Sequence, residues 1–71
     1  MRPLTAKQLV VILLANGFVL TRQRGSHQIY RNATVGVTVP VPLHAGNHPI
    51  HIGTFMAIVK QSKLPKKLFE R

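Results

Sequence analysis

The sequence predicts an α+β fold with the element order α-β-β-β-α, in which two helices cover one face of a three-stranded antiparallel sheet. Apolar residues near the N-terminus recur with helical spacing, and valines near the middle of the chain alternate with other residues. Only short turns separate the extended segments, which favours an antiparallel meander. With 71 residues, the chain is expected to form a single domain over residues 1–71.

The first predicted helix begins at Thr5 and ends at Asn16-Gly17. Thr5 and Gln8 have the spacing of a capping box, and Gly17 suits the left-handed conformation that ends many helices. Its inner face is expected to consist of Leu9, Ile12 and Leu13, flanked by Val10. The apolar residues outside that face are Val11, Leu14 and Ala15. A helix that is apolar nearly all round is usually buried on more than one side, so a second contact is expected, either with the sheet or with a partner.

Three short strands are predicted over residues 18–23, 26–31 and 35–42. In the first strand, Phe18 and Leu20 are expected to point toward the core. In the second, alternation places His27 on the same face as Ile29, which is the expected core residue. Tyr30 then points outward and is the aromatic residue available for stacking on a base.

A loop over residues 43–52 leads to a second helix, predicted to begin at Gly53-Thr54 and to end at Ser62 or Lys63. Its expected inner face consists of Phe55, Ile58, Val59 and Ser62. Pro65 cannot continue the helix, so residues 65–69 are expected to form one short turn from which Leu68 or Phe69 folds back. This element order is that of double-stranded-RNA-binding domains, an analogy that suggests RNA but does not establish it.

The charge of the chain is strongly unbalanced. Ten lysines and arginines face a single acid, Glu70, so the net charge is +9. Such a field has to be met by an external anion, and nucleic acid, an acidic protein and a lipid surface are the candidates. The longest apolar run, residues 9–15, is far shorter than the ~20 residues of a membrane span, so no membrane segment is expected. The absence of cysteine is compatible with a reducing cytoplasm.

The sharpest chemical signal is the turn and strand Gly25-Ser26-His27. Three arginines lie close to it in sequence: Arg22, Arg24 and Arg31. An imidazole can take the proton from a ribose 2′-hydroxyl that attacks the adjacent phosphate, and guanidinium groups can offset the charge that grows on that phosphate. The alternative is a half-buried, hydrogen-bonded histidine that only packs, and the spacing alone leaves both interpretations open.

The other histidines and the lysines carry weaker signals. His44, His48 and His51 form a His-x3-His-x2-His run, but no cysteine or nearby carboxylate completes a zinc site, so no metal and no cofactor are expected. Contact with RNA or simple solvation is the preferred interpretation of these loop histidines. Lys60 and Lys63 belong to a basic C-terminal flank and are expected to contact phosphates of the substrate backbone.

Several motifs, in this order and spacing, are similar to those of the HicA family of toxins from type II toxin–antitoxin modules. They are Asn16-Gly17-Phe18, Gly25-Ser26-His27-Gln28-Ile29-Tyr30, Val39-Pro40 followed by His44, Ile52-Gly53-Thr54-Phe55, and Ile58-Val59-Lys60-Gln61-Ser62. The resemblance covers nearly the whole chain.

The resemblance implies a double-stranded-RNA-binding-domain-like fold and mRNA interferase activity, with His27 as the catalytic residue. It also implies mRNA as substrate and a cognate, acidic HicB-like antitoxin that covers the active site. His44 matches a second, less constant histidine of the family, with a role in RNA contact or support. His48 and His51 have no counterpart.

The predicted function is therefore that of a cytoplasmic, metal-independent endoribonuclease. The substrate-binding residues are expected to be Arg22, Arg24, Gly25, Ser26, Arg31, His44, Lys60 and Lys63. Whether water, a lysine or the same imidazole protonates the leaving oxygen stays open, as does the oligomeric state. The alternative is a non-catalytic RNA-binding module that uses the same basic surface. A further role for the charge is docking of an acidic antitoxin, with the apolar residues of the first helix completing the contact.

Overall fold

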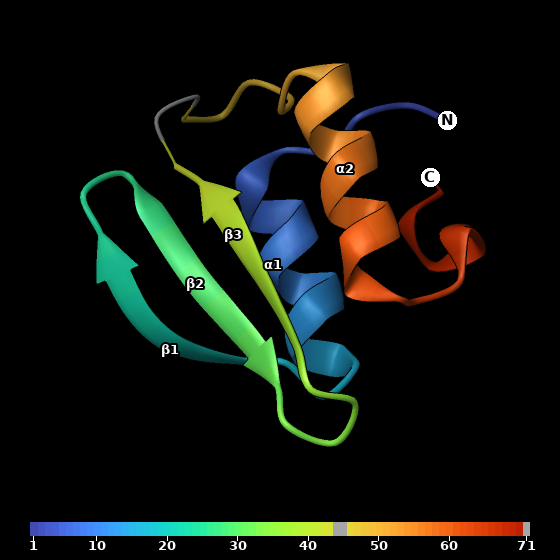
Figure 1. Cartoon of the computed structure of the whole chain (residues 1–71). Coiled ribbons are helices and arrows are strands. Elements are labelled where there is room, and N and C mark those ends of the chain that lie inside the picture. Colours follow the sequence, from blue (N-terminus) through green and yellow to red (C-terminus); the bar gives the residue numbers. More distant parts are fainter. Residues whose placement is uncertain (44–45, 71) are drawn as a thin grey trace.

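The computed structural model describes residues 1–43 and 46–70. Both long helices lie on the same side of an antiparallel three-stranded sheet with the strand order β1-β2-β3, which confirms the predicted α-β-β-β-α architecture (Figure 1). The elements are α1 (Ala6–Ala15), β1 (Val19–Arg24), β2 (His27–Asn32), β3 (Val37–Pro42), α2 (Ile52–Ser62) and the short 3-10 helix η1 (Lys66–Phe69).

Helix α1 has the predicted cap at each end. The backbone N–H of Gln8 donates to Thr5 Oγ1 (3.2 Å), and the backbone N–H of Thr5 donates to Gln8 Oε1 (3.0 Å), so the capping box is complete. At the other end Gly17 takes φ +91°, and the N–H of Phe18 donates to the carbonyl of Leu13 (3.1 Å). The chain can therefore enter β1 directly from the helix.

The inner faces of the two helices meet over β3. Leu9 and Leu13 of α1 are fully buried, and α2 buries the predicted set of Phe55, Ile58, Val59 and Ser62. Phe69 of η1 folds back as predicted, and its ring packs edge-on against Phe55 at a centroid distance of 6.3 Å. Val11 and Leu14 stay exposed on the far side of α1.

The proline-rich strand β3 ends at Pro42 as predicted, but it begins later. Val35 is 57 % exposed in the preceding turn, so its expected place in the strand was wrong. Pairing continues through Pro40 and Pro42 because β3 is an edge strand. The N–H of Leu43 donates to the carbonyl of Ser26 on the β2 side (2.7 Å), so the neighbouring Pro42 and Pro40 nitrogens face the open edge, where no donor is needed.

Strand β1 lies beyond the cover of the helices, at the edge of the sheet farthest from α2 (Figure 1). All six of its residues are exposed, and Leu20 retains 48 % of its accessible surface. Leu20 pairs with the buried Tyr30 and so faces the helix side, but no helix reaches it. The prediction that Leu20 belongs to the core was therefore wrong.

A buried amide ties the end of β2 to the end of α1. Asn32 is 7 % exposed, and its Nδ2 donates to the carbonyl of Asn16 (3.2 Å), while its Oδ1 accepts the N–H of Thr34 (3.1 Å). Gly17 lies so close that a Cβ atom built on it would approach Asn32 Nδ2 to 3.0 Å. Glycine is therefore required at position 17 for space as well as for its positive φ.

Within residues 1–43 and 46–70, no helix has the length and the apolar character that crossing a lipid bilayer would require.

The contact between Gly17 and Asn32 predicts a stability difference between two glycine substitutions. Gly17→Ala is expected to destabilise the fold by about 2–3 kcal/mol, because it adds crowding against Asn32 to the strain of a left-handed alanine. Gly36→Ala is the matched control, since Gly36 also has positive φ (+67°) but has open space around its Cβ position. It should cost about 1 kcal/mol. Urea unfolding measures both, and equal losses would contradict the role given to the contact.

Candidate active site

The hairpin between β1 and β2 places His27 at the first position of its strand. Gly25 and Ser26 form the two-residue turn, and Arg24 pairs with His27 directly across it. Gly25 takes φ +58° while Ser26 does not have positive φ. A positive φ at the first central residue alone is the pattern of a type II′ turn, which favours glycine there.

Three rows of side chains cross the face of the sheet that the helices leave open. Residues paired directly across an antiparallel sheet point to the same face, so the register defines each row. The rows are Arg24–His27–Pro42, Arg22–Ile29–Pro40 and Val19–Arg31–Thr38. Neighbouring rows are about 7 Å apart, the distance spanned by two residues of a strand. We call this surface the arginine face.

The orientation of β2 is opposite to the one predicted. Tyr30 and Asn32 are buried on the helix side, at 3 % and 7 % exposure, whereas His27 is exposed and Ile29 is half-buried on the arginine face. The predicted core role of Ile29 and the outward position of Tyr30 were therefore wrong, and Tyr30 is not available for stacking on a base. Because His27 lies on the open face, the alternative of a packing histidine loses its main support.

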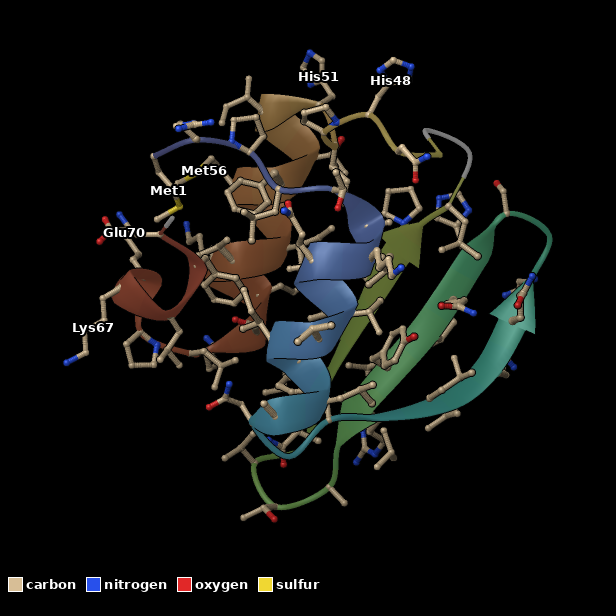
Figure 2. All side chains as sticks on the ribbon, turned by 180° about the vertical axis from the view of Figure 1, so that it is seen from behind. Met1, His48, His51, Met56, Lys67 and Glu70 are labelled. Atoms are coloured by element: carbon tan, nitrogen blue, oxygen red, sulfur yellow. The ribbon has the colours of Figure 1, made fainter. Side chains whose placement is uncertain are left out.

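The structure brings the three predicted arginines together with His27. Arg22, Arg24 and Arg31 are all exposed, and all three occupy the arginine face. Arg31 Nη1 donates to Thr38 Oγ1 (3.0 Å), which holds its guanidinium over the sheet. The chain's single acid, Glu70, lies beside η1 on the far side of the molecule from β1 (Figure 2). Among the residues that the structure describes, no acidic side chain therefore lies near the arginine face to offset its positive charge.

A chain of hydrogen bonds supports the hairpin from the helix side. The hydroxyl of Tyr30 donates to Gln28 Oε1 (2.8 Å), Gln28 Nε2 donates to Gln23 Oε1 (3.4 Å), and Gln23 Nε2 donates to the carbonyl of Gly25 (3.1 Å). The chain runs from the core to the turn that precedes His27. These bonds lie within the hairpin and connect its turn to the buried part of β2.

The turn is also joined to the end of β3, through the bond from Leu43 N–H to the carbonyl of Ser26. His44, which was expected to support RNA binding, lies outside the described residues. Its predicted role remains a prediction.

His48 and His51 lie at one end of the molecule with their side chains directed outward (Figure 2). His51 is the N-cap of α2, and its Nδ1 accepts the N–H of Gly53 (3.2 Å), so helix capping accounts for this residue. Among the residues that the structure describes, no three metal-binding side chains come together.

Lys60 and Lys63 are not on the arginine face. Both are exposed near the C-terminal end of α2, in the helix layer, and Lys63 is the left-handed C-cap of that helix (φ 64°). The structure therefore separates two groups of basic residues that the sequence had placed in one substrate site.

The sequence did not point to the residues that complete the arginine face. Pro42 and Pro40 neighbour His27 and Ile29 across the β2–β3 pairing, and Thr38 holds Arg31. The proximity of these residues to His27, Ile29 and Arg31 depends on the register between β2 and β3. Aligning the second predicted strand with the valine-rich strand would have revealed it.

Comparison with known protein families shows to which family the chain belongs. The model of the family described as the HicA toxin of bacterial toxin–antitoxin systems matches residues 6–64. The chain belongs to the HicA toxin family. It is thus the toxin of a toxin–antitoxin module. Membership of this family implies that its protein partner is an antitoxin. None of the curated proteins compared with the chain matches it.

The hydroxyl of Tyr30 predicts a pH-dependent stability. Burial raises the pKa of Tyr30 above its ordinary value of 10.0. As pH rises above about 10, the unfolded chain loses this proton before the folded chain does, so the free energy of unfolding falls. Tyr30→Phe should cost about 0.5–1.5 kcal/mol at pH 7 through the lost hydrogen bond to Gln28, and should lessen the loss between about pH 10 and 12.

Urea unfolding of both proteins at pH 7 and pH 11 measures this difference. All other residues are the same in both proteins, so the comparison isolates Tyr30. An equal loss of stability in the two proteins would contradict a buried, neutral Tyr30.

Proposed function

We propose that this HicA family toxin is a metal-independent endoribonuclease that cleaves mRNA on its arginine face. The observation that carries the proposal is the row Arg24–His27–Pro42 with Arg22 in the next row, which joins a proton-transfer group to phosphate-binding groups on an open surface.

RNA cleavage needs a group that transfers protons and groups that stabilise the charge on the phosphate, and the arginine face supplies residues for both. The His27 imidazole takes the proton from the ribose 2′-hydroxyl, whose oxygen attacks the adjacent phosphorus. The bond from phosphorus to the 5′-oxygen breaks, which leaves a 2′,3′-cyclic phosphate and a 5′-hydroxyl after that oxygen gains a proton. Arg24 and Arg22 bind the oxygens of the reacting phosphate and stabilise the negative charge that grows on them, and Arg31, two rows from His27, binds a neighbouring phosphate of the strand.

The shape of the surface suits an extended single strand. The face is an open sheet, and the half-buried Ile29 and Pro40 and the buried Pro42 form an apolar floor between the arginines. An RNA strand that crosses all three rows passes one arginine in each row. Such contacts with phosphates give affinity without reading the base sequence.

The proposal includes the cellular setting. The toxin acts in the cytoplasm, where mRNA is found, and an acidic, HicB-like antitoxin holds it inactive by covering the arginine face. The rival function is an RNA-binding module that does not cleave, and it predicts complexes with RNA but no products.

Replacing His27 tests the proposal. His27→Ala should reduce cleavage of a labelled RNA by at least about 100-fold through loss of the general base, and should leave the fold intact because the side chain is exposed. His48→Ala is the matched control and should cleave like the natural toxin. The products should carry 2′,3′-cyclic phosphate ends, and EDTA should not change the rate. Full activity of His27→Ala, or RNA binding without any products, would overturn the proposal.

A further inference from the structure

A groove lined by apolar side chains and lysines lies at the C-terminal end of α2, between that helix and the segment leading into η1. Its volume is about 490 Å³, within the ~300–1,000 Å³ of typical ligand sites. Three apolar side chains line it: Met56, Val59 and Leu64. Three lysines line it as well: Lys60, Lys63 and Lys66.

The groove lies on the helix side of the sheet. The C-terminal end of α2 is far from the β1–β2 hairpin that carries His27, and the arginine face points away from the helix layer (Figure 1). A ligand seated in the groove therefore leaves the arginine face uncovered.

The lining favours an acidic protein segment over RNA. Among the residues that the structure describes, no aromatic ring lines the groove for a base to stack on, and half of the lining residues are apolar. An acidic segment with an apolar anchor matches both parts, because its carboxylates can pair with the lysines while its apolar side chain covers Met56 and Leu64. Both of these residues are only partly buried, so the anchor would remove further apolar surface from water.

The charge of the whole chain points to the same occupant. With a net charge of +9 and one acid, the toxin offers an acidic partner a favourable field over most of its surface. We infer that the groove of Met56, Val59, Leu64 and the three lysines docks an acidic, apolar-anchored segment of the antitoxin. The inference rests on the proposed function only for the identity of the partner, and it assigns Lys60 and Lys63 to protein binding instead of RNA contact.

The inference has a structural consequence for inhibition. Docking in the groove holds the antitoxin to the toxin, while blocking of RNA requires separate contacts at the arginine face. Loss of the groove should therefore lower the affinity of the complex more than it lowers the inhibition reached at saturating antitoxin.

Calorimetric titration of the purified toxin with the antitoxin of its own module tests the inference. Lys60→Glu/Lys63→Glu should weaken binding by about 30-fold or more, which is about 2 kcal/mol. Met56→Gln, which keeps the charge, should weaken it by about tenfold. Lys7→Glu is the matched control for one charge reversal, because Lys7 is an exposed lysine on α1, and it should change the affinity less than threefold. Circular dichroism confirms the fold of each variant.

Cleavage of RNA by the free toxin variants separates this inference from the proposed function. Met56→Gln should cleave at the natural rate, and Lys63→Glu should lose no more activity than Lys7→Glu. If the groove variants keep full affinity for the antitoxin, the inference is overturned, and a selective loss of RNA cleavage would reassign the groove to RNA. If the natural toxin cleaves no RNA, the ribonuclease proposal fails while the affinity data still decide the role of the groove.

Discussion

The buried amide of Asn32 is the interaction on which the position of the site depends. It donates to the carbonyl of Asn16 and accepts from Thr34, so the last residue of β2 has to face the helices. Because side chains alternate along a strand, Asn32 on the inner face places Arg31 and His27 on the outer face. The left-handed Gly17 makes this contact possible by leaving room beside the amide. A feature at one end of the sheet thereby determines which way the histidine at the other end points.

The basic residues are divided between the two sides of the molecule. Three arginines, Arg22, Arg24 and Arg31, lie on the open face of the sheet, where their planar guanidinium groups suit phosphate oxygens. Three lysines, Lys60, Lys63 and Lys66, lie around the C-terminal end of α2. The helix layer covers β3 and leaves β1 uncovered, so the edge of the arginine face extends into solvent. This division gives one small chain two separate basic surfaces, one for the proposed RNA substrate and one for the proposed protein partner.

Local patterns predicted the two long helices, the caps of α1 and the buried side of α2, because those features depend on residues three or four positions apart. The orientation of β2 was not predictable in this way. Ile29 and Tyr30 are adjacent and both suit a core, so alternation alone allows either face, and the contact between Asn32 and Asn16 decides between them. His27 and its arginines were recognised as neighbours in sequence, whereas the rows they form, with Pro42 and Thr38, depend on register between strands. The exposure of Leu20 depends on how far the helices extend over the sheet, which no short pattern records.

The central claim is that RNA binds and is cleaved on the arginine face. The most direct measurement is an amide chemical-shift map of the labelled toxin with an RNA whose 2′-hydroxyls are methylated, so that it binds but cannot be cleaved. The account predicts the largest shifts along β1 and β2, at Arg22, Arg24, His27 and Arg31. Shifts concentrated at the C-terminal end of α2, with the strands unperturbed, would contradict it.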